Sequence, residues 1–229
     1  MPTTHPAVHV NSKRQNPSRE SKARAPQRIF LLSPANAGGV RAKMIMSENA
    51  RFVLARRLRN DGLPLGELFS FISGLYFRGK LAYARAFASP PVGMPGILVI
   101  TAGRGLVSPD ALMTHGEMME IADVPVDAGE PRYRMPLQRD AQELLRKAGK
   151  RCEIVLLGSI ATAKYVEPLL GIFEERLLFP SAFVGRGDMS RGGLMLRSVQ
   201  EGAELGYEPV GSAIRHGPRP PKLSKIRYT

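Results

Sequence analysis

The chain has 229 residues, of which 43% are hydrophobic and 23% are charged, and its formal net charge is +13. This composition is typical of a globular protein with a sizeable core and excludes a largely disordered chain. The longest apolar stretches, such as Gly96 to Ala102, have the length of a strand, so we expect a soluble protein without a membrane-spanning helix.

The positive charge is concentrated at the two ends of the chain. Residues 1–28 contain six Lys or Arg and one Glu, and residues 211–229 contain five Lys or Arg and no acidic residue. About +10 of the +13 therefore lies at the ends. Basic tails neutralise phosphates and release counterions, which predicts a nucleic acid, DNA or RNA, as the partner. The alternatives are tails that only confer solubility and, less favoured because neither tail has an apolar face, a membrane surface.

We therefore predict a disordered basic tail (1–27), a single α/β domain (28–210) and a basic, proline-rich C-terminal tail (211–229). No apolar segment follows the first basic residues, so we expect no secretory signal. Cys152 is the only cysteine and can form no internal disulfide, which is typical of a cytoplasmic protein. No obligate protein partner can be deduced.

In chain order, the first part of the domain reads as a strand followed by helices. Arg28 to Ser33 is an apolar run closed by Pro34, typical of a buried strand. One long helix is predicted around Met46 to Leu58, because its apolar residues share one face. A short helix over 67–73 and a longer one over 75–88 follow.

Further strands and helices alternate in the rest of the domain. We predict strands over 96–101, 152–158, 176–179 and 205–210, and helices over 136–148, 161–170 and 190–200. Continuous apolar strands between amphipathic helices predict a mostly parallel sheet covered on both faces, that is, a three-layer Rossmann-like α/β domain. Ligands of such sheets bind beyond the carboxyl ends of the strands, here the loops 33–41, 101–110 and 158–165.

The loop 33–41 holds glycines before a helix, where backbone N–H groups can approach an anion. Ser33, Asn36 and Arg41 are candidate binding residues there, and a simple tight turn is the alternative. In the loop 158–165, Ser159 and Tyr165 are candidates, and helix capping is the alternative.

The loop 101–110 contains half of a dinucleotide fingerprint, Gly103-Arg104-Gly105, with Arg104 placed to face a phosphate. Asp110 and His115 follow closely and are candidates for acid–base catalysis. The alternative for a lone histidine is a surface or structural role.

The stretch 185–193 is the most unusual in the chain, because it joins glycines, arginines, a carboxylate and a hydroxyl before a helix. Arg186, Ser190 and Arg191 are predicted to bind an anion, and Asp188 to act as a general base or to orient Arg186. A flexible loop with a capped helix is the alternative.

Basic and aromatic residues alternate over 69–87, a pattern that suits contact with bases and phosphates. Tyr76, Arg78 and Lys80 are the candidates, although aromatics at helical spacing also fit a core. One cysteine and four histidines build no typical zinc site, so no metal is predicted, and no cofactor is identified.

Several short motifs occur in the order seen in two α/β families. They are Leu31-Leu-Ser-Pro-Ala35, Ser73 to Lys80, Val99 to Asp110, Val124-Pro-Val-Asp127 and Tyr165. The first resembles the opening strand of the bacterial peroxide-stress proteins, which implies DNA binding and protection against oxidative damage. The strand exit within Val99 to Asp110 and the segment Val124 to Asp127 resemble the core domain of the archaeosine synthase alpha subunit, which implies recognition of a 7-deazaguanine base in RNA or DNA.

The positions that match best are Tyr76, Arg78, Gly105 and Asp127. The Pro-Cys-Ser and Lys-Pro-Tyr-Ser stretches of the archaeosine enzyme are absent, so its amide-forming chemistry does not carry over. We predict a nucleic-acid-binding protein that recognises a base or nucleotide at its strand-exit loops, with base modification or nucleotide-directed transfer as the candidate reaction. A non-enzymatic DNA-binding stress protein and a small-nucleotide enzyme remain alternatives.

Overall fold

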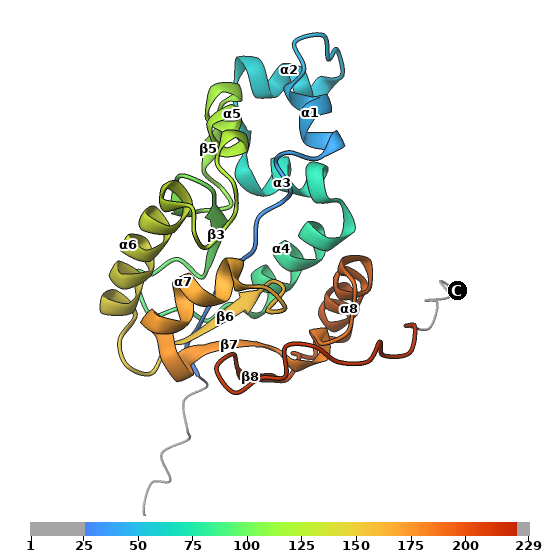
Figure 1. The fold of residues 1–229 in the computed structure, drawn as a ribbon. Coiled ribbons are helices and arrows are strands. Elements are labelled where there is room, and N and C mark those ends of the chain that lie inside the picture. Colours follow the sequence, from blue (N-terminus) through green and yellow to red (C-terminus); the bar gives the residue numbers. More distant parts are fainter. Residues whose placement is uncertain (1–25, 224–229) are drawn as a thin grey trace, which may run out of the picture.

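A six-stranded sheet lies at the centre of the computed structural model, which describes residues 26–223 (Figure 1). The strand order is β4-β3-β1-β6-β7-β8, and the four inner strands are parallel: β1 (Arg28–Leu32), β3 (Ile97–Thr101), β6 (Glu153–Leu157) and β7 (Leu177–Pro180). The edge strands β4 (Gly105–Val107) and β8 (Tyr207–Pro209) are antiparallel to their neighbours. The predicted α/β class with a mostly parallel sheet is thus confirmed, and it is consistent with a Rossmann-like fold.

The central strand β1 pairs with β3 on one side and β6 on the other. Leu31 is opposite Leu98 and Leu156, and residues 29–32 and 154–157 are all buried. The chain passes from β1 to β3 and then crosses to β6, so strand order reverses beside β1. Parallel sheets open a crevice at such a reversal, beyond the carboxyl ends of the strands.

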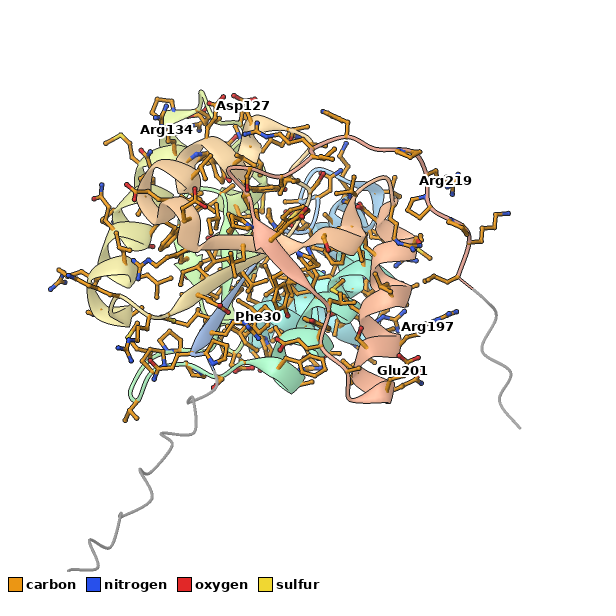
Figure 2. All side chains as sticks on the ribbon, turned by 90° about the horizontal axis from the view of Figure 1, so that it is seen from below. Phe30, Asp127, Arg134, Arg197, Glu201 and Arg219 are labelled. Carbon is orange, nitrogen blue, oxygen red and sulfur yellow. The ribbon has the colours of Figure 1, made fainter. Side chains whose placement is uncertain are left out.

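Two helix pairs pack beside the sheet. The first, α4 (Leu75–Phe87) and α8 (Asp188–Glu201), makes the most extensive helix–helix contact in the described chain. The second is α6 (Pro131–Ala148) with α7 (Ala163–Phe173), where α6 also contacts β3 and β4. Figure 2 shows Phe30 of β1 among packed side chains, whereas Arg197 and Glu201 of α8 point outward.

Four shorter helices and a two-stranded ribbon gather above the carboxyl ends of β1 and β3 (Figure 1). These are α1 (Val40–Met46), α2 (Val53–Asn60), α3 (Leu65–Ser73), α5 (His115–Asp123), β2 (Leu63–Pro64) and β5 (Leu112–Met113). Two 3-10 turns flank β7, Glu174–Arg176 and Ser181–Phe183.

The single helix predicted around Met46 to Leu58 is wrong, because a turn over 47–52 separates α1 from α2. Arg59 of α2 donates to the carbonyls of Ser47 (3.0 Å) and Ala50 (2.6 Å), and Phe52 stacks on Phe71 of α3. These contacts with other elements stabilise the turn.

Two helix starts also differ from the prediction. α6 begins at Pro131 and not at Pro136, because Glu130 caps it by accepting from the Arg132 N–H at 3.0 Å. α8 begins at Asp188, two residues before the start predicted at residue 190. Local propensity leaves such boundaries open by a few residues.

The predicted N-terminal tail lies outside the described residues except for its last two positions. The C-terminal segment is described to Leu223 and follows the body past α8 (Figure 1). Gly185 has a φ of +70°, and a Cβ at this position would lie 2.1 Å from the Pro218 carbonyl oxygen. Arg186 also donates to the Pro221 carbonyl, so this part of the segment is packed against the protein. Within residues 26–223, no helix has the length and apolar character needed to cross a membrane.

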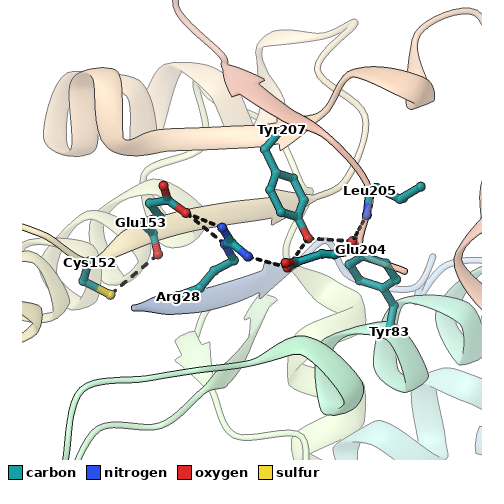
Figure 3. A network of polar contacts seen from close by, with 7 residues as sticks. All are labelled: Arg28, Tyr83, Cys152, Glu153, Glu204, Leu205 and Tyr207. Atoms are coloured by element: carbon teal, nitrogen blue, oxygen red, sulfur yellow. Dashed lines mark hydrogen bonds and ion pairs between the residues drawn. The ribbon is translucent and has the colours of Figure 1, made fainter. Parts of the chain in front are cut away.

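Arg28, counted above with the basic N-terminal residues, belongs to β1 and is held by a partly buried polar network (Figure 3). Its guanidinium donates to Glu153 and Glu204 and stacks 4.7 Å from the centre of the Tyr207 ring. Tyr207 and Tyr83 share a 2.6 Å hydrogen bond between their hydroxyls. The network ties β1, β6 and β8 together, so Arg28 is not available to a nucleic acid.

Arg28→Met is therefore expected to lower the free energy of unfolding by about 3 kcal/mol, because Glu153 and Glu204 lose a cation whose side chain is only 11% exposed. Arg85→Met is the matched control, since its ion pair with Asp110 is more than half exposed and should contribute less than about 1 kcal/mol. Urea unfolding of both variants measures the difference. Equal losses would show that the Arg28 network is no stronger than a surface pair.

Candidate functional site

A cavity of about 510 Å³ opens at the carboxyl ends of β1, β3 and β6, where the strand order reverses. We call it the strand-exit cavity. Its wall combines polar side chains from four separate segments with an apolar side formed by the segment 121–126. The polar members are Ser33, Asn36, Ser73, Tyr76, Ser159, Lys164, Tyr165 and Asp188.

The loop after β1 is shaped by Asn36. Its side-chain oxygen accepts from the Gly38 N–H at 3.1 Å, and its carbonyl accepts from the Gly39 N–H at 3.1 Å. This turn chemistry brings Ser33, Asn36 and the adjacent backbone to the cavity wall. Arg41 does not line the cavity, and it donates to the Phe71 carbonyl at 3.3 Å.

Two tyrosines contribute aromatic surface to the cavity. Tyr76 of α4 is 6% exposed, and its hydroxyl has no hydrogen-bond partner among the described residues. Burial raises the pKa of Tyr76 to about 12 and also raises the pKa of Tyr165 on α7. Both phenols therefore stay protonated at neutral pH and can donate a hydrogen bond to a ligand.

Lys80 lies beneath the cavity and is fully buried. Its Nζ lies 2.5 Å from the Ser33 carbonyl oxygen and 2.9 Å from Ser33 Oγ, and the Tyr76 and Phe77 rings cover it. Burial lowers the pKa of Lys80 to about 7, with Asp188 raising it and Arg191 lowering it. A buried ammonium without a carboxylate at contact distance loses its proton readily.

The start of α8 forms the remaining edge of the site. Asp188 lines the cavity and is exposed, whereas Arg191 is buried and donates to the Phe183 carbonyl at 3.2 Å. The two side chains lie 3.5 Å apart. Arg191 therefore holds the helix start in place and does not face the cavity directly.

The structure thus gathers part of the predicted set in one place. Six predicted residues line the cavity: Ser33, Asn36, Tyr76, Ser159, Tyr165 and Asp188. Lys80 and Arg191 lie next to it.

The other predicted residues lie outside the strand-exit cavity. Asp110 pairs with Arg85, and His115 shares a 2.7 Å hydrogen bond with the Met46 carbonyl, so the three predicted catalytic residues are not brought together. Arg104 pairs with Glu117 and Glu120 of α5 and, with Gly103, borders a neighbouring hollow. Gly105 packs against Asp140.

Arg186 and Ser190 bond to each other at 3.2 Å and border a separate cavity of about 360 Å³ beside residues 219–223. Arg78 is exposed on α4. Asp127, matched in the family resemblance, accepts from the Gly129 N–H at 2.8 Å. These contacts are local and organise loops.

No site role is predicted above for the wall segment 121–126, which includes the last turn of α5 and the residues after it and carries Ile121, Val124 and Val126. Its only signal in the sequence is the Val124-Pro-Val-Asp127 motif. The segment reaches the cavity because α5 lies above the strand ends, which is a tertiary feature.

Comparison with family models, curated proteins and solved structures finds no match to this chain. The class of protein is therefore defined by the fold and the site alone: an α/β protein with a mostly parallel sheet and a polar, tyrosine-lined cavity at its topological switch point.

Proposed function

We propose that this protein binds nucleic acid and holds one base or nucleotide in the strand-exit cavity. The observation that carries the proposal is a cavity of about 510 Å³ in which Tyr76 and Tyr165 lie with amide, hydroxyl and carboxylate side chains. Aromatic rings stack on bases, and amide and carboxylate groups bond to base edges. A cavity of this size suits a nucleotide-sized ligand.

Charge supports the nucleic-acid part of the proposal. The chain carries +13 overall, and Lys164 contributes a cation to the cavity itself. Arg219 and Lys222 lie on the packed C-terminal segment, where Arg219 points away from the body (Figure 2). Cations at the ends of the chain would give sequence-independent grip, and the cavity would give selectivity.

We also propose the type of base that is bound, the layering of the domain and the compartment in which the protein works. The bound base is of the 7-deazaguanine type, as the family resemblance implies, and base modification is the candidate reaction. The domain has three layers, with α4 and α8 on one face of the sheet and α6 and α7 on the other. The protein works in a reducing cytoplasm, because its single cysteine can form no internal disulfide.

The sequence-independent binding is tested by measuring affinity for labelled DNA and RNA oligonucleotides at several salt concentrations. The affinity is expected to fall steeply with salt, by roughly 10³-fold between 50 and 200 mM for six phosphate contacts. Arg219→Gln combined with Lys222→Gln should flatten the slope. Glu143→Gln combined with Lys147→Met, which removes an exposed ion pair of α6 and no net charge, is the control. An affinity that does not change with salt would contradict binding through phosphate contacts.

The cavity is tested by calorimetry with guanosine, 7-deazaguanosine, adenosine and cytidine. Tyr165→Leu is expected to weaken the preferred nucleoside roughly 10-fold or more, since one base–aromatic stack contributes about 1–3 kcal/mol. Asp110→Asn, outside the cavity, should leave binding unchanged. Tight binding of a free mononucleotide with little salt effect would favour a small-nucleotide enzyme, and absence of nucleoside binding would favour a DNA-binding stress protein.

A further inference from the structure

We propose that Ser33 is a nucleophile and Lys80 its general base, and that this pair transfers an acyl group from an ester or amide bound in the strand-exit cavity. The inference concerns the cavity described above but does not rest on the nucleobase proposal, because any acyl-bearing ligand of suitable size would serve. It stands on the placement of Ser33, the contacts of Lys80 and the free hydroxyl of Tyr76.

Ser33 is held rigidly where β1 meets the cavity. Its N–H donates to the Leu157 carbonyl of β6 at 3.1 Å, and Pro34 follows directly. On the other side is Gly158, where an added Cβ would lie 3.0 Å from Ser33 Cβ. Ser33 is 4% exposed and lines the cavity, so its hydroxyl is both fixed in position and next to the ligand space.

Lys80 has the contacts expected of a base. A neutral amine can donate to the Ser33 carbonyl at 2.5 Å and accept the Ser33 Oγ proton across 2.9 Å. Within residues 26–223, no ion pair joins Lys80 to a carboxylate, whereas buried lysines in structural roles are usually paired. The charged groups that face it from α8 are Asp188 and Arg191.

The third element is a donor for the charge that develops on the substrate. Burial raises the pKa of both tyrosines, whereas Arg191 and Ser33 lie close enough to the Tyr76 hydroxyl, and Ser33 to the Tyr165 hydroxyl, to lower their pKa values. The Tyr76 hydroxyl nonetheless has no hydrogen-bond partner among the described residues. A buried, unpaired donor beside the nucleophile is the arrangement that stabilises an oxyanion.

The reaction balances without a cofactor. Ser33 Oγ forms a bond to the carbonyl carbon while its proton passes to Lys80 Nζ, and Tyr76 donates to the oxyanion. The bond to the leaving alcohol or amine then breaks, and Lys80 returns the proton to that group. Water then attacks the acyl-serine and gives a proton to Lys80. The bond between the acyl carbon and Ser33 Oγ breaks, the acid is released, and Lys80 returns the proton to Ser33 Oγ, which restores both residues.

The test is labelling of the full-length protein by diisopropyl fluorophosphate, read by mass spectrometry. One diisopropylphosphoryl group is expected on Ser33, with release of fluoride. Lys80→Met should slow labelling by roughly 100-fold or more, the usual contribution of a general base. Ser33→Ala should abolish it, and Ser212→Ala, which alters an exposed hydroxyl near Pro209, should leave the rate unchanged.

The wild-type rate should also rise with pH through about 7, which tests the pair even where Lys80→Met does not fold. The proposal would be overturned if Ser33 were not labelled, if the labelling rate did not change between pH 6 and 9, or if Lys80→Met were labelled at the wild-type rate. Nucleoside binding by Ser33→Ala separates the two proposals: retained binding without wild-type labelling would leave the base-binding function standing and remove only the acyl transfer.

Discussion

Gly192→Ala is expected to lower the free energy of unfolding by about 3 kcal/mol, because α4 and α8 approach each other through glycine. A Cβ on Gly192 would lie 2.7 Å from the Leu75 carbonyl oxygen, and a Cβ on Gly79 would lie 2.7 Å from the Gly192 carbonyl oxygen. Both obstructing atoms are backbone, so the helices themselves would have to separate. The helical preference of alanine, about 1 kcal/mol over glycine, offsets only part of this cost.

Gly171→Ala is the matched control in α7, since nothing lies within 4 Å of the added methyl group. It should be neutral or raise stability by up to about 1 kcal/mol. Urea unfolding of the two variants measures the contrast. If Gly192→Ala were as stable as Gly171→Ala, the close helix crossing would be wrong. The crossing also matters for the site, because α8 carries Asp188 to the cavity and places Arg191 3.5 Å from Asp188.

The second large effect is a rise in stability of about 2 kcal/mol between pH 7 and 9, caused by Lys80. Its pKa is lowered to about 7 in the folded protein from an ordinary value of 10.5, chiefly by burial. At a pH between about 7 and 10.5, Lys80 binds a proton in the unfolded chain but not in the folded protein. Stability therefore increases as the pH rises, and the destabilisation by the buried charge is largest below pH 7.

Lys80→Met should remove this contribution, so its stability relative to wild type should fall as the pH rises from 7 to 9. The buried tyrosines limit the window at the upper end, since the raised pKa of Tyr76 acts only near pH 10 and above. Lys147→Met, at an exposed ion pair of α6, is the control and should show no such trend. Parallel pH profiles for wild type and Lys80→Met would show that Lys80 keeps its proton.

Much of the site's location, though not its composition, was predictable. Strands end where their apolar runs end, so the loops after Leu32 and Leu157 could be placed from the sequence, and parallel strands bring such loops to one edge. Ser33, Asn36, Ser159 and Tyr165 follow from that rule. Lys80 was a correct candidate for a wrong reason. The alternation of basic and aromatic residues predicted contact with nucleic acid, whereas the Lys80 side chain is buried.

The misplaced elements have a common cause. The turn between α1 and α2 depends on Arg59 and on the stacking of Phe52 against Phe71, which are contacts between different elements. The pairings of Arg104 with α5 and of Arg28 with Glu204 are likewise remote in the chain. Local periodicity contains no information about such partners.

The sequence by itself determined the class of fold, the mostly parallel sheet and the excess of positive charge, because apolar periodicity and composition are local properties. Only the tertiary structure decided which side chains meet. It separates Asp110 and His115 from Asp188, adds the segment 121–126 to the cavity, and places Lys80 against Ser33. Burial then changes the chemistry of Lys80, since desolvation depends on the packing around a group and not on its neighbours in the chain.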